Sequence, residues 1–319
     1  MNPLSKYVLG RVGQAAVVIW AAYTVTFGIL YLLPGDPISI MLNNADSGVV
    51  DEEMSAALRA QYGFDRSPAL QYFMLLGRAL QGDFGNSISN GAPVTTLIAQ
   101  VFPETLKLAG LGLFFALVLG VGIAVASIWV PNRRVQNLLL NLPPAGISVP
   151  TFWVGLLLLQ VFSFQFPIFP AVGNEGIASL ILPALTLAIP LSAIIAQVLA
   201  DSLHTTWRSS HVVTAQAKGA TRTRVLSHHV SRNAIIPTLT IIGVLVGNVV
   251  AGSVVVETVF SRAGFGRLIQ TSVQSQDIPV IQGFVVIAAV IFVTANLAVD
   301  LVYPVVDPRI RTGPVAIKA

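Results

Sequence analysis

Long apolar stretches, separated by polar segments, dominate the pattern of hydrophobic and polar positions. A membrane-spanning helix needs about 20 apolar residues, because the hydrocarbon core is about 30 Å thick and a helix rises about 1.5 Å per residue. Six stretches meet this requirement, at residues 12–33, 108–130, 138–164, 180–200, 235–256 and 280–302. The pattern therefore predicts an all-α integral membrane protein with six transmembrane helices.

The composition supports this reading and removes several classes of chemistry. Only 10% of the 319 residues are charged, whereas soluble domains carry about 25%. The chain has no cysteine, which excludes disulfide scaffolds, thiolate metal sites and cysteine nucleophiles. The net charge of +4 is modest, and the basic residues form no stripe suited to nucleic acid.

Basic residues are distributed unequally between the two sets of loops. One set holds Lys6, Arg11, Arg133, Arg134, Arg208, Lys218, Arg222, Arg224, Arg232, Arg309, Arg311 and Lys318, and in the other set acids outnumber arginines. Because cytoplasmic loops are enriched in Lys and Arg, we expect both termini in the cytoplasm. The apolar run from residue 12 is too long for a cleaved signal peptide, so it is interpreted as a retained first span.

The connection at residues 34–103 is predicted to be a small extracytoplasmic helical insertion. Asp51 suits the N-cap of a helix that continues to about Tyr62, and Pro68 suits the first position of a second helix that ends before Gly82. We therefore divide the chain into residues 1–33, the insertion 34–103 and a core transmembrane domain 104–319. The insertion either packs beside the membrane or receives substrate directly.

The polar connection at residues 201–234 is predicted to lie on the cytoplasmic side. Ser209 or Ser210 can cap a short helix that ends at Gly219, a residue suited to a left-handed stop. Thr221 can cap a second helix with Val225, Leu226 and Val230 on one face. A basic helical pair of this kind suits either anionic lipid or a protein partner.

Several strings give the chain a resemblance to a known family. Residues 214–219 (TAQAKG) followed by residues 232–237 (RNAIIP) resemble the EAA loop of ATP-binding-cassette importer permeases, in the version found in B-type subunits of oligopeptide and dipeptide permeases. Val213 replaces the glutamate of the general pattern. The strings at 32–37, 82–87, 257–268 and 307–311 are also similar to that branch.

The resemblance implies a type I importer fold in the bacterial inner membrane. It implies a homologous C-type permease, two cytoplasmic ATPase domains and an extracytoplasmic substrate-binding protein or lipoprotein as partners, with ATP and magnesium on the ATPases and no cofactor on this chain. No lysine follows a glycine as a P-loop requires. The implied ATPase-docking residues are Thr214, Ala215, Gln216, Ala217, Lys218, Gly219 and Ala220.

Candidates for the translocation path lie in the fifth predicted span. Gly243, Gly247 and Ala251 recur every four residues, which suits close helix packing, and the candidates for path or gate are Thr240, Gly247, Asn248 and Ser253. The four histidines have no spacing that requires a metal, so no metal site is predicted.

Short peptides are the preferred substrate. A path for peptides must accept varied side chains, so it should be wide, weakly polar and poor in fixed charge, and the predicted spans suit such a path. Haem and a nickel or other metal chelate remain alternatives for the same permease role. An ion-coupled secondary transporter is a less favoured reading, because no carboxylate falls near the middle of a predicted span. A membrane-embedded enzyme would need paired carboxylates or a nucleophile with its base, and the chain offers only scattered acids on the external side.

Overall fold

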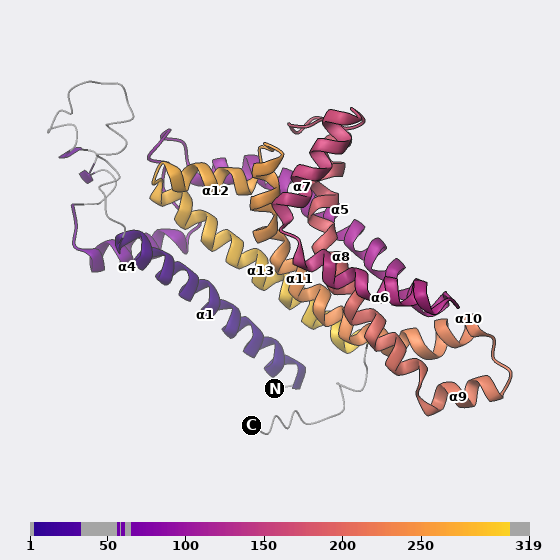
Figure 1. Cartoon of the computed structure of the whole chain (residues 1–319). Coiled ribbons are helices and arrows are strands. Elements are labelled where there is room, and N and C mark those ends of the chain that lie inside the picture. The colour runs from indigo at the N-terminus through magenta and orange to yellow at the C-terminus, as the bar shows by residue number, and fades with distance from the viewer. Residues whose placement is uncertain (1–2, 33–55, 58, 61–64, 307–319) are drawn as a thin grey trace. The chain divides into compact units, whose positions relative to one another are not determined.

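The computed structural model describes residues 3–32, 56–57, 59–60 and 65–306, and its regular structure in these ranges is helical (Figure 1). The one β feature found there is an isolated antiparallel bridge between Asn86 and Pro93. Most of the helix predicted from Asp51 to Tyr62, and the strings at 34–37 and 307–311, lie outside the described residues.

Five helices among the described residues are long and apolar enough to cross a membrane, which confirms the predicted fold class. The helices that supply them are α1 (Pro3–Leu32), α5 (Val94–Trp129), α8 (Ala178–Trp207), α11 (Ser231–Val259) and α13 (Ile278–Val306). A sixth span results if one bent pair of helices is counted as a single crossing. Because α5 begins at Val94, the second spanning helix starts about ten residues inside the segment assigned to the insertion.

The predicted third span is not one continuous helix. It consists of α6 (Arg133–Ser148) followed by α7 (Thr151–Leu159) and the π-helical segment η1 (Gln160–Gln165), with a bend of 99° between the two parts. The break falls at Val149, whose extended backbone (φ −87°, ψ 128°) reflects the steric exclusion of helical geometry before a proline, here Pro150.

The contacts divide the chain into two units, Met1–Thr105 with Ala263–Val293, and Leu106–Arg262 with Thr294–Ala319. In the first unit, α4 (Pro68–Ala79) begins at the predicted proline. Leu70 and Phe73 on the helix and Leu80 at its C-cap are exposed, however, and the helix packs against α1 through Tyr72. Tyr72 contacts the Phe27 ring edge-on, and its hydroxyl is 2.7 Å from the hydroxyl of Thr24.

The loop after α4 is held by a buried carboxylate in the same unit. Asp277 lies between α12 (Phe265–Gln274) and α13, and its side chain is only 1% exposed. It accepts hydrogen bonds from the hydroxyls of Ser87 and Ser89 and from the backbone amide of Ile88 at 3.1 Å. These donors satisfy the buried charge and fix the loop that contains the family-like string at 82–87.

The second unit is built around α8, which packs against α5, α6, α7 and α11. Its contact with α5 is made through small residues four positions apart on α5, namely Gly112, Ala116 and Gly120. A Cβ added at Gly120 would lie 2.8 Å from the carbonyl oxygen of Ser192 on α8. Small residues permit this approach of two helix backbones.

Candidate functional site

The predicted basic loop begins later than expected, because α8 continues to Trp207. The short helix α9 (Ser210–Ala217) follows, with Ser209 in extended geometry at the N-cap position. The Ser209 hydroxyl donates to the carbonyl oxygen of Thr206 at 2.6 Å and does not cap α9. The predicted start of the helix is therefore confirmed, but the serine hydroxyl stabilises the turn before it.

The end of α9 is the left-handed stop that the sequence predicts. Gly219 has φ +82°, a conformation that residues with a Cβ rarely adopt. Its amide donates to the carbonyl oxygen of Gln216 at 2.9 Å, and the amide of Ala220 donates to that of Ala215 at 3.1 Å. These bonds satisfy carbonyls that a helix end otherwise leaves without partners.

The second predicted helix begins at its expected cap but does not end before the fifth span. Thr221 accepts a hydrogen bond from the amide of Arg224, and α10 (Arg222–Arg224) continues through the π-helical segment η2 (Val225–Val230) into α11. The loop is thus shorter at both ends than residues 201–234. Hydropathy marks only the part of a helix suited to lipid, so it missed these polar extensions.

An apolar cluster, here called the anchor cluster, fixes the loop to the spanning helices. Val225 and Val230 of η2 are both fully buried, because the i→i+5 repeat of a π-helix places residues five apart on nearly the same side. They meet Val212 of α9 and the ends of α5 and α8, in a cluster of Ala124, Ile128, Leu199, Ala200, Leu203, Val212, Val225, Val230 and Ala234.

Arg222 connects the loop to the ends of two spanning helices. Its guanidinium carbon lies 5.6 Å from the ring centroid of Trp129 and 5.7 Å from that of Trp207, which are cation–π distances. Its Nη2 also donates to the carbonyl oxygen of Ile128 in the last turn of α5, where a helix has unpaired carbonyls and a partial negative charge. We call Arg222 with Trp129 and Trp207 the arginine clamp.

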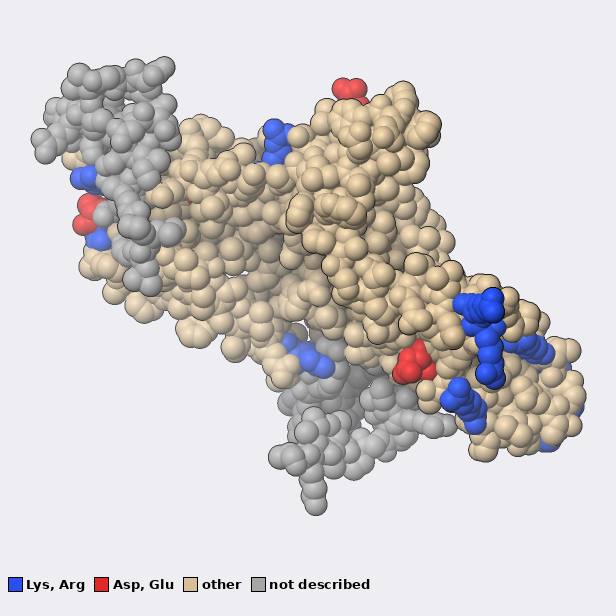
Figure 2. Space-filling view, viewed as in Figure 1, with Lys and Arg blue, Asp and Glu red and all other residues tan. Residues whose placement is uncertain are grey.

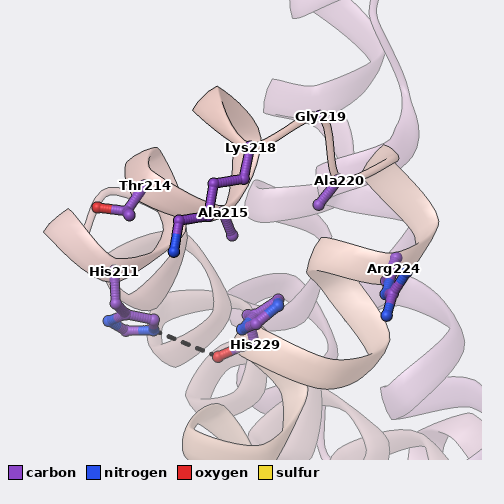
Figure 3. A pocket seen from close by; sticks show the side chains of 8 residues that line it. All are labelled: His211, Thr214, Ala215, Lys218, Gly219, Ala220, Arg224 and His229. Atoms are coloured by element: carbon purple, nitrogen blue, oxygen red, sulfur yellow. Dashed lines mark hydrogen bonds between the residues drawn. The ribbon is translucent and has the colours of Figure 1, made fainter.

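A basic concavity lies between α9 and the chain that returns from it (Figure 3). Its volume is about 570 Å³, and it is lined by His211, Thr214, Ala215, Lys218, Gly219, Ala220, Arg224 and His229. Figure 3 shows the imidazole of His211 directed toward the carbonyl of His229, at 3.4 Å. Figure 2 shows Lys and Arg side chains gathered over the end of this unit that carries α9 and α10.

The seven residues predicted to dock on an ATPase are contiguous on α9 and the turn that follows. Thr214, Gln216, Ala217, Lys218 and Gly219 are exposed. Ala215 and Ala220 are partly buried and pack against the anchor cluster. The segment therefore presents one outward face and one face bound to the protein.

The four path candidates on α11 do not share one environment. Thr240 and Asn248 are exposed, whereas Gly247 and Ser253 are buried. The Ser253 hydroxyl donates to the carbonyl oxygen of Val250 at 2.7 Å, within its own helix. The first two belong to a continuous exposed stripe made of Asn233, Pro237, Thr240, Val244, Asn248, Ala251 and Val255.

Sequence reasoning missed the part that Arg222 plays. It counted Arg222 only as one positive charge in a basic loop, although two tryptophans, Trp129 and Trp207, stand at the ends of neighbouring helices. A tryptophan at a helix end with an arginine in a nearby loop was the available signal, but their proximity depends on the tertiary fold.

Comparison with known families and proteins places this arrangement in context. The family described as "Binding-protein-dependent transport system inner membrane component" matches residues 93–312, which is more than half of the chain. The glutathione transport system permease protein GsiC of Salmonella paratyphi A is 36% identical over 312 residues, covering 98% of this chain and 99% of that protein. The probable peptide ABC transporter permease protein y4tP of Sinorhizobium fredii is 33% identical, covering 97% and 100%.

Solved structures support the fold. An inward-facing structure of the MetNI methionine ABC transporter aligns with a TM-score of 0.57 over 66% of this chain and 96% of that chain, at 16% identity. A crystal structure of an amino acid ABC transporter with histidines aligns with a TM-score of 0.50 at 20% identity, over 67% and 94%. The helical core is therefore an importer transmembrane-domain fold.

Membership of this family means that the chain is a multi-pass inner membrane subunit and not a catalyst, in a system with ATPases, a partner permease and a binding protein. The two full-length relatives cover the membrane helices, the basic loop and the first unit alike. The chain belongs to the family of binding-protein-dependent transport system inner membrane components and is a permease subunit of an ATP-binding-cassette importer.

Proposed function

We propose that this chain is the B-type permease subunit of an importer of short peptides, with glutathione-like tripeptides in the same substrate class. It forms half of the translocation path with a C-type permease, and its basic loop docks on a cytoplasmic ATPase. The relatives named for glutathione and peptide transport support this substrate class. In this arrangement both termini lie in the cytoplasm.

The arginine clamp is the observation that carries the coupling role. A loop that transmits force must be fixed to the helices that it moves, and Arg222 joins the loop to α5 through Trp129 and to α8 through Trp207. The anchor cluster adds a packed apolar contact to the same helices. A loop that only rested on lipid would need neither attachment.

The charge of the loop indicates an acidic partner surface. The stretch 202–256 contains no Asp or Glu, and Lys218, Arg224 and two histidines surround the basic concavity. Complementary charge across an interface selects the partner and speeds its association. We infer that the ATPase surface facing α9 is acidic.

Movement of the loop reaches the path through packed helices. When the ATPases close, displacement of α9 acts on α5 and α8 through the clamp and on α11 through the continuous helix from Arg222. Two discrete packings of these helices then correspond to inward-open and outward-open states. The exposed α11 stripe, with Thr240 and Asn248 among small and apolar residues, offers a weakly polar wall that suits peptides with varied side chains.

Site-directed cross-linking tests the docking role directly. The chain has no cysteine, so a thiol introduced by Gln216→Cys on the exposed face of α9 is its only reactive thiol. We expect this variant to cross-link to the ATPase in the purified assembly. The matched control is Glu175→Cys, which is also exposed but precedes α8 at its other end. Equal cross-linking of the two variants, or none from Gln216→Cys, would overturn the docking proposal.

Uptake into vesicles tests the substrate class. The complete assembly with its binding protein is reconstituted, and ATP-dependent uptake of a labelled tripeptide is measured against unlabelled peptides and haem. We expect competition by peptides and none by haem. Uptake driven by an ion gradient in the absence of the ATPases would support a secondary transporter and contradict the proposal.

A further inference from the structure

A second cavity lies in the same unit as the basic loop, between α6 and the last turns of α8. Its volume is about 860 Å³, within the range of small-molecule sites. Its walls carry Arg133 at the start of α6, and Asp201 and Arg208 along the end of α8. We call it the α6–α8 cavity. It is separate from the basic concavity and shares no lining residue with it.

The cavity presents both signs of charge. Arg133, Asp201 and Arg208 are all exposed, and no ion pair joins them in the described part of the chain. His204, which lies between the charges, is 3.3 Å from the hydroxyl of Ser127 through Nε2. Two cationic groups and one anionic group thus remain available to a ligand, which must itself carry both charges to satisfy them.

The spacing of these charges on α8 indicates the length of that ligand. Asp201 and Arg208, the C-cap residue of α8, are seven residues apart, so their Cα atoms lie on one side of the helix and about 10 Å apart along its axis, at 1.5 Å per residue. An extended peptide spans about 3.3–3.6 Å per residue. A peptide of about three residues therefore has its ammonium and carboxylate ends at a matching separation.

The remaining lining is compatible with varied side chains. Leu139 and Leu140 supply apolar surface, and the amides of Asn137 and Gln197 are exposed at the wall. Gln136 is already engaged, because its Nε2 donates to the carbonyl oxygen of Ser127 at 3.0 Å. Two charged ends with a nonspecific middle are what recognition of peptides by their termini requires.

We propose that the α6–α8 cavity is a binding site for short zwitterionic peptides on the cytoplasmic side. The peptide ammonium pairs with Asp201, and the carboxylate is held by Arg208 and Arg133. This inference rests on the proposed function, since it gives the imported peptide a site on the side where it is released. The site belongs to the permease itself and does not involve the external binding protein.

Equilibrium binding to the purified assembly, without its binding protein and without ATP, tests the site. The probes are labelled tri-alanine, its N-acetylated form and its C-amidated form. We expect tri-alanine to bind about tenfold more tightly than either blocked form. Asp201→Asn should weaken the binding of tri-alanine by about tenfold and leave binding of the N-acetylated form unchanged. Arg208→Gln should weaken the binding of tri-alanine by about tenfold and leave binding of the C-amidated form unchanged. Glu175→Gln, at an exposed acid elsewhere in this unit, is the control and should change nothing.

Several results would overturn the proposal. They are equal binding of free and blocked peptides, loss of affinity in Asp201→Asn for every probe alike, or displacement by a zwitterionic phospholipid in place of peptide. Dialanine and penta-alanine give the length test, and both should bind more weakly than tri-alanine. The vesicle uptake assay separates the two proposals. Peptide uptake without binding at this cavity rejects the site alone, whereas binding without ATP-dependent uptake rejects the proposed function.

Discussion

The backbone of Gly120 on α5 lies so close to the carbonyl of Ser192 on α8 that a Cβ at Gly120 would be 2.8 Å from that oxygen. The same Cβ would lie 2.9 Å from the side chain of Ile195. Since the obstacle includes backbone, it cannot move aside as a flexible side chain can. The two helices are therefore fixed at a distance that only glycine allows.

Gly120→Ala is expected to destabilise the assembly by about 1–3 kcal/mol, the usual cost of overpacking a well-packed site. Thermal inactivation of the purified assembly measures the loss. Gly122→Ala is the matched control, because it lies one half-turn away on the same helix and its added Cβ would meet nothing within 4 Å. Equal stability of the two variants would contradict the close contact.

Substitution of Arg222 is expected to uncouple transport from ATP hydrolysis. Arg222→Gln removes the cation that Trp129 and Trp207 share and weakens the bond to the Ile128 carbonyl. We expect ATPase activity to continue while peptide uptake falls at least tenfold. Arg232→Gln is the control, since Arg232 has the same charge ten residues away, is exposed and lines neither the basic concavity nor the α6–α8 cavity. Uptake equal to that of Arg232→Gln would show that the clamp has no part in coupling.

Substitutions of Gly219 change the backbone geometry of the turn after α9 without changing the charge of the loop. Gly219→Val forces a β-branched residue into the left-handed region, at a cost of about 1–2 kcal/mol or more, although no neighbour would obstruct its Cβ. We expect lower uptake per ATP hydrolysed. Asn tolerates this backbone conformation better than other residues with a Cβ, so Gly219→Asn should retain most of the uptake. If the two variants behave alike, the turn is not the critical element.

Asp277→Asn should loosen the loop at residues 86–92. The variant replaces a carboxylate that accepts at both oxygens with an amide, whose NH₂ group faces the backbone N–H of either Ile88 or Ser89 in whichever way it is turned. A buried polar mismatch of this kind costs about 1–3 kcal/mol. We expect faster hydrogen exchange in the peptide that contains residues 86–92, with exchange in α8 unchanged. Unaltered exchange in that peptide would show that the carboxylate does not hold the loop.

Asp83, in the loop that follows α4, gives a prediction of pH dependence. The hydrogen bond from Arg78, together with that from the Gly85 amide, lowers the pKa of Asp83 below its usual 3.8. Because the pKa is lower in the folded state, the ionised Asp83 stabilises the fold above pH 3.8. This stabilisation is lost as the pH falls through the folded-state pKa. Because the pair is exposed, its contribution to stability is small.

A fluorescent label placed by Gln81→Cys can follow this titration. We expect a transition of the label with a midpoint below pH 3.8, and no such transition in the double variant that also carries Asp83→Asn. A midpoint at or above 3.8 would contradict the ion pair. Between pH 5 and pH 8, the titration of Asp83 should cause no change in the fluorescence of the label.

The sequence predicted those features that depend on local chemistry. The spans follow from continuous apolar runs, and the loop turn follows from Gly219 and Thr221, whose conformational and capping preferences act within a few residues. The start of α4 at Pro68 has the same origin. The docking residues stay a prediction, although five of the seven are exposed on one short segment.

Features set by tertiary contacts could not be predicted in this way. The third span contains Pro143, Pro144 and Pro150, and α6 accommodates the first two while the chain bends before the third. The sequence alone does not indicate which proline breaks the helix. The arginine clamp likewise joins residues that are 93 and 15 positions apart in the sequence. On α4, the side that packs against α1 is the one that carries Tyr72, and the apolar residues that suggested an inward face are exposed.

The run of helix from Arg222 to Val259 comprises 38 residues, a length of about 57 Å at 1.5 Å per residue. Arg222, the first residue of this run, is held against Trp129 and Trp207. A tilt of about 5° at its first turn swings its far end by about 5 Å, simply from that length. Under the docking proposal, a small push by the ATPase at this end would become a displacement comparable to the width of a peptide backbone at the other end.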